Sequence, residues 1–333
     1  MEHRDNQALQ HSSIFGIENE VEFARVALDV FHYQSESCSV YKRYLQLLDV
    51  HAQSVVSVAE IPFLPIEIFR EAPVIAEGTV AQMVFRSSGT TGTITSSHHV
   101  ADLSMYRESL LKGFRRCYGS PADYTFLALL PTYIERPDAS LIYMVKALME
   151  DSGQPFSGFY IDDLDALYHR IIELQKAGKK IFLLGVTFAL LDFADRYSLQ
   201  LDNAIVVETG GMKGRRKEII RDDLHERLCE RLGVNTIHSE YGMTELLSQA
   251  WSKGSGRYTT PPWMHIDIGD MNDPFQRLGE GTTGVIRVID LANLYSCSFI
   301  ATQDIGKKYA DGTFEVLGRI DNSDLRGCNL MVQ

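Results

Sequence analysis

Apolar residues recur at helical spacing in two stretches near the start of the chain, residues 18–34 and residues 40–48. Side chains three and four positions apart lie on one face of a helix, so this pattern predicts two amphipathic helices. A third apolar stretch, residues 61–70, contains Pro62 and Pro65, which prevent a regular helical start. That stretch predicts an extended, buried turn that leads into a short helix.

From residue 80 onward, short apolar runs alternate with amphipathic segments. The apolar runs predict strands at residues 80–85, 124–130, 180–185, 204–208 and 234–238. The amphipathic segments predict helices at residues 103–117, 141–150, 164–177, 188–197 and 215–232. Asp102 and Thr187 are expected to be N-caps of two of these helices. Such alternation is typical of an α/β fold, and we expect a layered fold with a largely parallel sheet.

After about residue 255 the helical periodicity disappears. Residues 263–268, 284–289, 298–301 and 314–317 predict strands separated by Gly- and Asp-rich turns, and hence a smaller β-rich subdomain. No internal repeat or low-complexity linker interrupts the sequence. We therefore expect a single core over residues 1–333, with a helical part (1–79), a layered α/β part (80–254) and a β-rich part (255–333).

The composition is that of a globular protein, with 45% hydrophobic and 23% charged residues among 333. The formal net charge of −12 argues against nucleic acid and anionic membranes as partners, because both require a basic face. No apolar run approaches the roughly 18 residues of a membrane span, and the charged first residues do not resemble a signal peptide. The five cysteines contain no CxxC pair, which indicates free thiols in a reducing compartment. We therefore expect a soluble, cytoplasmic protein.

A stretch rich in hydroxyls and glycines follows the first strand predicted in the α/β part. Residues 84–93 are Val-Phe-Arg-Ser-Ser-Gly-Thr-Thr-Gly-Thr. Gly89 and Gly92 allow the backbone to approach a ligand closely, and the surrounding amides and hydroxyls can donate to phosphate oxygens. The stretch is not a Walker A loop, because no Gly-Lys-Ser/Thr follows. By itself it is equally compatible with an ordinary Ser/Thr/Gly turn.

Four later segments place polar residues where predicted strands end, which is where α/β folds bind ligands. They are Glu208-Thr209-Gly210-Gly211, residues 238–245 (His-Ser-Glu-Tyr-Gly-Met-Thr-Glu), Thr302-Gln303-Asp304 and Gly318-Arg319-Ile320-Asp321. Tyr241 offers an aromatic face for a base, Glu245 offers a carboxylate for Mg²⁺, and Asp304 can accept both hydroxyls of a ribose. Each segment also has an ordinary explanation as a tight turn, a solvated acid in a first helical turn or a surface ion pair.

The order of these motifs resembles that of the adenylate-forming superfamily of acyl-CoA ligases and luciferases. Within the superfamily, the sequence is most similar to the acyl-protein synthetases, the long-chain-fatty-acid–protein ligases of bacterial luminescence systems. Residues 62–66, 133–137, 208–214 and 326–328 share this likeness and extend it to nearly the whole chain.

The resemblance implies a site for ATP and Mg²⁺. In it, Ser88, Gly89, Thr90, Thr91 and Gly92 would hold the phosphates, Gly210 and Gly211 would line the adenine site, and Tyr241 would stack on adenine. Of the residues given catalytic roles, Thr244 would contact the α-phosphate and Glu245 would bind Mg²⁺. Asp304 and Arg319 would hold the ribose.

The sequence departs from the superfamily pattern in two places. The phosphate loop usually continues to a Pro-Lys pair, whereas here residues 93–99 are Thr-Ile-Thr-Ser-Ser-His-His. His98, His99 and Arg326 are the candidates for meeting phosphate charge, although a His pair at this place is more often structural. The chain also stops at Gln333, so we expect it to lack the mobile C-terminal lid domain with its catalytic lysine.

Cys328 lies five residues before the end of the chain, next to Arg326 and Gly327. A neighbouring arginine lowers the pKa of a thiol, and the thiolate is a strong nucleophile. The resemblance implies that Cys328 receives the acyl group as a thioester, whereas the alternative is a buried cysteine that acts as a small hydrophobic residue. Cys38, Cys117, Cys229 and Cys297 are expected to be structural.

The function expected from the resemblance is ATP-dependent activation of a fatty carboxylic acid to an acyl-adenylate. The acyl group would then pass to Cys328 and on to a partner protein, an acyl reductase or an acyl carrier. Two alternatives remain open. One is a lid-less ligase that delivers an aryl or short acyl group to CoA or a carrier, and the other is a degenerate nucleotide-binding scaffold without activity.

Overall fold

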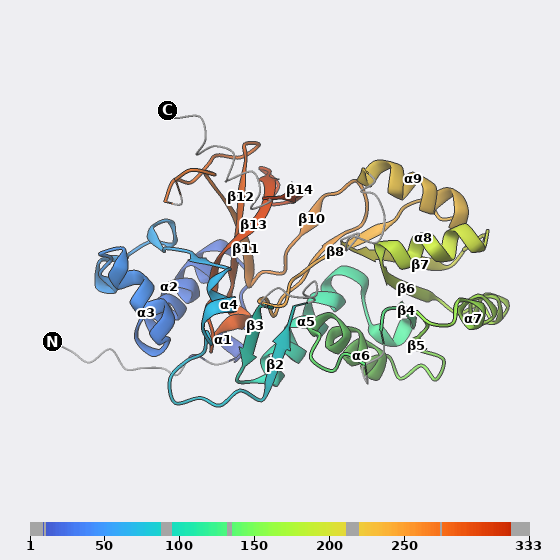
Figure 1. Ribbon diagram of the computed structural model, residues 1–333, viewed down its shortest axis with the longest axis horizontal. Coiled ribbons are helices and arrows are strands. Elements are labelled where there is room, and N and C mark those ends of the chain that lie inside the picture. Colours follow the sequence, from blue (N-terminus) through green and yellow to red (C-terminus); the bar gives the residue numbers. More distant parts are fainter. Residues whose placement is uncertain are drawn as a thin grey trace. The chain divides into compact units, whose positions relative to one another are not determined.

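The computed structural model describes residues 9, 11–87, 95–131, 135–210, 220–273 and 275–320, and Figure 1 labels most of its helices and strands. The chain divides into two units, which are described separately. Unit 1 combines residues 1–80 with residues 262–333, and unit 2 comprises residues 81–261.

A sheet forms the centre of unit 2, with its strands in the order β10-β9-β8-β7-β6-β4-β5. The strands are β4 (Thr125–Leu129), β5 (Gly158–Phe159), β6 (Ile181–Val186), β7 (Ala204–Thr209), β8 (His238–Tyr241), β9 (Ala250–Ser252) and β10 (Tyr258–Thr259). Neighbours from β5 to β8 pair in parallel, whereas β9 and β10 are antiparallel. Every residue of β4 and β6 is buried, as expected for parallel strands covered on both faces. The predicted α/β fold class is confirmed.

Helices cover both faces of this sheet. They are α5 (Leu103–Tyr118), α6 (Ser140–Ser152), α7 (Leu164–Lys176), α8 (Thr187–Arg196) and α9 (Arg221–Leu232), with the short 3₁₀ helix η3 (Pro121–Asp123) before β4. Phe114 of α5 contacts Phe126 and Phe182, which are register partners on β4 and β6. A Cβ added at Gly185 of β6 would lie on the opposite face of the sheet, 3.0 Å from Leu190 of α8. The apolar runs are therefore buried between two helical layers.

Three predicted details in unit 2 were wrong. Residues 80–85 were expected in the parallel sheet, but β2 (Met83–Arg86) pairs antiparallel with β3 (Ser97–Val100) in a separate two-stranded sheet, because the connection between them is too short for a parallel crossover. The strand expected at 234–238 begins only at His238, since the N–H groups of Gly233 and Val234 close the end of α9 on the carbonyl of Cys229. Thr187 is the first residue of α8, not its N-cap.

Asp102 is the N-cap of α5, as predicted, and its carboxylate accepts a hydrogen bond from the N–H of Ser104 at 2.8 Å. This contact pairs one of the N–H groups that a helix start leaves without an intrahelical partner.

An antiparallel sheet of β11 (Met264–Gly269), β12 (Thr283–Asp290), β13 (Phe299–Lys308) and β14 (Phe314–Arg319) forms the β-rich part of unit 1. The extended turn predicted from the proline-containing segment is confirmed. It contains β1 (Leu64–Pro65), which pairs in parallel with β13, and it leads into the short helix α4 (Ile68–Glu71).

The helices α1 (His11–Phe15), α2 (Glu20–Ser37) and α3 (Ser39–Leu47) and the 3₁₀ helices η1 (Ala52–Ser54), η2 (Val58–Glu60) and η4 (Leu291–Asn293) complete unit 1. Gln34 of α2 is fully buried and bonds to the segment before β13. Its amide donates to the carbonyls of Asn293 and Leu294, both at 2.9 Å, and accepts from the N–H of Ser298 at 2.9 Å. This side chain joins segments about 260 positions apart. Across the ranges that the structure describes, no helix is both long and apolar enough to cross a membrane.

Candidate active site

The carboxyl ends of β6, β7 and β8 lie next to one another in unit 2. Val186, Thr209 and Glu240 are register partners across these strands. Gly210 follows β7 directly, and Tyr241 is the last residue of β8. Gly210 and Tyr241 therefore lie at this edge, where parallel sheets bind ligands, and Thr244 and Glu245 follow Tyr241 in the next segment.

Tyr241 and Glu245 are both buried, with 8% and 6% of their surface exposed. The ring of Tyr241 contacts that of Tyr258, with centroids 6.0 Å apart. Glu245 lies in a turn closed by the N–H of Leu246 and the carbonyl of Met243, and not in a helix. The ordinary explanation of Glu245 as a solvated acid in a first helical turn therefore does not apply.

His98 connects β3 to the segment that contains Thr244 and Glu245. Its Nδ1 lies 2.9 Å from the backbone carbonyl of Thr244, and a carbonyl can only accept, so Nδ1 bears the proton. Burial lowers the pKa of His98 to about 4, and burial also lowers the pKa of His99. His98 is thus neutral at pH 7 and does not fit the cationic role in phosphate binding considered for it.

Glu208, near the end of β7, is a buried and ionised carboxylate. Thr187 Oγ1 donates to its Oε2 at 3.2 Å, and His225 Nε2 lies 3.8 Å from its Oε1. Burial alone would raise the pKa of Glu208, but interactions with His225, Ser239 and Arg221 outweigh that effect and lower it. The residues around Glu208 therefore stabilise a negative charge at the end of β7.

Glu240, on the neighbouring strand, has the opposite character. Burial, with a smaller contribution from the charge of Glu208, raises the pKa of Glu240 to about 8, so most of it is protonated at pH 7. A Cβ at position 242 would lie 2.4 Å from Glu240 Oε1, so Gly242 leaves room for this carboxyl group. Adjacent strands thus carry one ionised and one largely neutral acid near their carboxyl ends, an arrangement that sequence patterns did not indicate.

Asp304 and Arg319 are direct cross-strand partners on β13 and β14 of unit 1. The sequence placed Asp304 just after a strand, but β13 continues to Lys308, so the aspartate lies within the strand. Arg319 Nε lies 3.9 Å from Asp304 Oδ1. Thr302 Oγ1 accepts from the N–H of Asp304 at 3.0 Å and donates to the carbonyl of Ile286 at 2.7 Å, which fixes the backbone at the aspartate. Arg319 is more exposed than Asp304, because 58% of its side chain is accessible against 18% for the aspartate.

Two further residues of this cluster, Glu67 and Gln303, were not predicted. Gln303 Nε2 donates to Glu67 Oε1 at 2.6 Å, and Gln303 Oε1 accepts from Arg319 at 3.3 Å. The only sequence signal was the position of Gln303 inside the Thr-x-Asp motif. No local pattern connects it to Glu67, 236 positions away.

Several predicted residues lie outside the described residues: Ser88, Gly89, Thr90, Thr91, Gly92, Gly211, Arg326 and Cys328. Asp304 and Arg319 belong to unit 1, and Gly210, Tyr241, Thr244 and Glu245 belong to unit 2. The grouping of both sets around one nucleotide therefore stays a prediction.

The donor set of unit 2 fits a magnesium ion bound together with a nucleotide. Mg²⁺ usually binds one or two carboxylates, several waters and substrate phosphates, and Glu245 is a buried carboxylate on a fixed turn. Within the described part of the chain, no group of three or more His, Cys, Asp or Glu side chains is arranged around a metal position.

The four cysteines that the structure describes do not resemble activated nucleophiles. Cys38 and Cys297 are buried, and Cys117 and Cys229 are half-buried. Burial raises the pKa of each thiol, which disfavours the reactive thiolate. These four residues are therefore structural, as expected.

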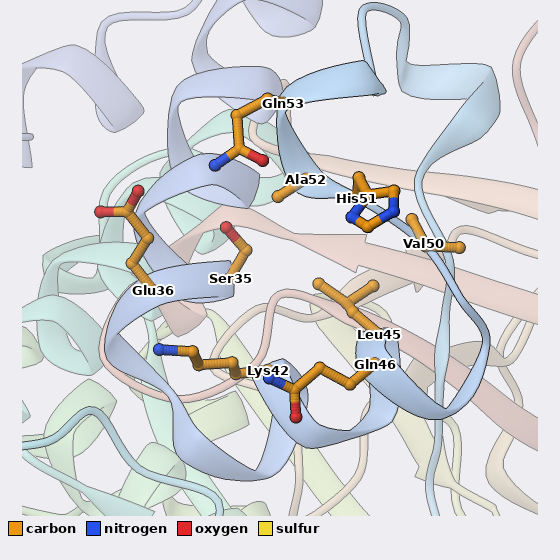
Figure 2. A pocket seen from close by; sticks show the side chains of 9 residues that line it. All are labelled: Ser35, Glu36, Lys42, Leu45, Gln46, Val50, His51, Ala52 and Gln53. Atoms are coloured by element: carbon orange, nitrogen blue, oxygen red, sulfur yellow. The ribbon is translucent and has the colours of Figure 1, made fainter.

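Unit 1 also contains a pocket of about 460 Å³ beside α2, α3 and η1 (Figure 2). Its lining mixes one acid, one lysine, neutral polar groups and apolar side chains: Ser35, Glu36, Lys42, Leu45, Gln46, Val50, His51, Ala52 and Gln53. None of the predicted site residues that the structure describes is among those that line this pocket.

Comparison with known proteins gives a family and a fold. The family model described as "Acyl-protein synthetase, LuxE" matches residues 15–333. A search of curated proteins found no match. A structure of 2-hydroxyisobutyryl-CoA ligase in an open conformation, in complex with 2-HIB-AMP and CoA, aligns with a TM-score of 0.67 and 13% identity over 91% of this chain and 70% of that one.

ATP-bound MatB from Rhodopseudomonas palustris aligns with a TM-score of 0.52 and 18% identity, over 71% of this chain and 47% of MatB. The chain thus spans about half the length of MatB. At such identities these alignments establish the fold.

Proposed function

Because the chain belongs to the LuxE family of acyl-protein synthetases, we propose that it activates a fatty carboxylic acid with ATP and transfers the acyl group to Cys328 and then to a partner protein. The family match over nearly the whole chain is the observation that carries the proposal. An adenylate-forming ligase fits both the family and the fold. The fatty substrate and the thiol acceptor are the proposed parts.

In the first step, a carboxylate oxygen of the acid attacks the α-phosphorus of ATP. The bond from this phosphorus to the bridging oxygen breaks, and pyrophosphate leaves with the electron pair. The acyl-adenylate that remains is a mixed anhydride. Catalysis of such a step requires groups that stabilise the charge developing on the phosphate oxygens.

Under this proposal, the described residues take distinct roles in this step. Tyr241 binds the adenine, Asp304 and Arg319 bind the ribose, and Thr244 contacts the α-phosphate. His98 holds the Thr244 carbonyl, which fixes the turn between β8 and Glu245. Mg²⁺ bound by Glu245 would supply Lewis-acid stabilisation of phosphate charge.

In the second step, the thiolate of Cys328 attacks the carbonyl carbon of the acyl-adenylate. The thiol of Cys328 has passed its proton to solvent when the thiolate forms. The carbon–oxygen bond to AMP then breaks, AMP leaves with the electron pair, and a thioester forms. Attack of a nucleophile on the partner protein, an acyl reductase or an acyl carrier, then releases Cys328. The raised pKa values of the four described thiols make them poor competitors for the acyl group.

Two measurements test the proposal. Acid-dependent exchange of labelled pyrophosphate into ATP, across a panel of carboxylic acids, reports the first step and identifies the acid. Intact-protein mass spectrometry after incubation with ATP, Mg²⁺ and that acid reports the second. We expect a mass increase of one acyl group in the wild type and in Cys117→Ser, and none in Cys328→Ser.

Each alternative function gives a different result. CoA-dependent AMP release without acylated protein would identify a CoA or carrier ligase. If no acid supports pyrophosphate exchange, the chain is a scaffold without this activity. Equal labelling of the wild type and Cys328→Ser would exclude Cys328 as the acceptor.

A further inference from the structure

We propose that Glu67 and Gln303 are positioning residues that hold the guanidinium of Arg319 in the orientation needed to bind the ribose of ATP. The inference rests on the proposed function, because it takes Asp304 and Arg319 to be ribose ligands. All four residues belong to unit 1. The inference follows from how β1 runs beside β13 and from the direction of each hydrogen bond.

The pairing of β1 with β13 brings Glu67 to Gln303. Leu64 and Pro65 pair in parallel with Ile300 and Ala301, and the N–H of Ile66 donates to the carbonyl of Ala301 at 3.0 Å. Continuing this register by two residues places position 67 opposite position 303. The segment turns into α4 at Glu67, whose side chain then meets Gln303 at 2.6 Å.

The two contacts of Gln303 determine which way its amide points. A carboxylate accepts only, so the amide NH₂ must face Glu67, and a guanidinium donates only, so the amide oxygen must face Arg319. Both hydrogen bonds are charge-assisted, and each polarises the amide in the direction that strengthens the other. Gln303 itself is 9% exposed, and its backbone carbonyl accepts from Ile320 at 2.8 Å, so the amide sits on a fixed strand.

Arg319 needs such support because it is the least restrained member of the cluster. Its side chain is 58% exposed, and the Asp304 carboxylate is 3.9 Å from Nε, too far for a strong hydrogen bond. An exposed arginine otherwise samples many rotamers, and that freedom is lost when it binds a ligand. Glu67 and Gln303 reduce this loss by holding the guanidinium beside Asp304 before ATP arrives.

The prediction is a loss of nucleotide affinity without a loss of folding. Glu67→Ala should raise the Kd for ATP, measured by calorimetry on the full chain, about three- to tenfold. Glu67→Gln keeps an oxygen that accepts from Gln303 and should restore most of the affinity. Glu71→Ala, an exposed change in the adjoining helix α4, is the matched control and should bind ATP as the wild type does.

A double-mutant test decides whether Glu67 acts through Arg319. If it does, Glu67→Ala causes no further loss of ATP affinity in an Arg319→Ala background. In exchange assays, the KM for ATP should rise while the KM for the acid stays constant, a split that general destabilisation would not produce.

Three results would overturn the inference: wild-type Kd in Glu67→Ala, an undiminished effect of Glu67→Ala in the Arg319→Ala background, or no ATP binding by the wild type. ATP binding that depends on Glu67, together with no acid-dependent exchange, would support the positioning role and refute the proposed reaction. The two failures are therefore distinguishable.

Discussion

At the level of single residues, two buried ionisable side chains, Glu240 and His98, are neutral beside the segment that contains Tyr241 and Glu245. Burial is the main cause in both cases, because a charged form loses its hydration. Since one is an acid and the other a base, burial moves their pKa values in opposite directions. Their contributions to stability therefore change with pH in opposite senses.

Glu240 should make the protein less stable at alkaline pH. Its pKa is about 8 in the folded state against 4.5 for the ordinary side chain, so the folded state binds more protons between these values. The free energy of unfolding therefore falls as pH rises through this window, and it stops falling above about pH 8. We expect Glu240→Gln to resemble the wild type at pH 5 and to be more stable at pH 9 by on the order of 3 kcal/mol.

Urea unfolding at pH 5, 7 and 9 measures this difference, with the exposed change Glu230→Gln as the control. Parallel pH profiles for the wild type and Glu240→Gln would contradict the assignment of a raised pKa to this residue.

His98 should make the protein less stable in acid. Its pKa is about 4 in the folded state against 6.5 for free histidine, so the unfolded state binds more protons between these values. The contribution of neutral His98 to the free energy of unfolding is at its maximum above about pH 6.5 and is lost as pH falls toward 4. His98→Phe removes that pH dependence but leaves the Thr244 carbonyl without its donor, which costs about 1–3 kcal/mol at pH 7.

Thermal melts at pH 7 and pH 5 separate the two effects on His98→Phe. The variant should melt below the wild type at pH 7, and the difference should shrink at pH 5. A difference that grows in acid would mean that His98 is charged in the folded state.

At the level of elements, the segments with the clearest periodicity were predicted best. The structure has α5 at Leu103–Tyr118 and α7 at Leu164–Lys176, within a few residues of the expected bounds. The short strands β3, β5, β9 and β10 were missed, because two- to four-residue strands have no periodicity of their own and depend on partners elsewhere. β8 begins later than predicted, because the N–H groups of Gly233 and Val234 bond to the last turn of α9.

The attachment of α2 to the segment before β13 depends on the buried amide of Gln34. Gln34→Leu has a similar volume but leaves the N–H of Ser298 and the carbonyls of Asn293 and Leu294 without this partner. We expect a loss of about 2–4 kcal/mol in the free energy of unfolding, because each orphaned buried group costs about 1–3 kcal/mol and part of the loss is recovered by relaxation. Denaturant unfolding of Gln34→Leu beside the exposed change Glu36→Leu measures it, and equal midpoints for the two would contradict this role.

At the level of the whole molecule, a nucleotide that binds only the folded chain must stabilise it. ATP with Mg²⁺ at about 100 times its Kd adds about 2.7 kcal/mol, which corresponds to several degrees of melting temperature for a chain of this length. GTP at the same concentration should add less, because its base differs from adenine. Scanning fluorimetry measures both, and the absence of any shift with ATP would contradict a nucleotide site.

The sequence by itself determined the fold class, most helices and the motifs that indicated the family. Periodicity and motifs depend only on residues near one another in the chain, and the order of the motifs is read directly along it. Only the tertiary structure decided which acids are charged and which side chains orient others. Glu208 and Glu240 are each the next-to-last residue of neighbouring strands, yet their surroundings move their pKa values in opposite directions. Glu67 meets Gln303 across 236 positions only because β1 runs beside β13. Burial and contacts of this kind depend on the packing of distant segments, so they cannot be read from the residues nearby.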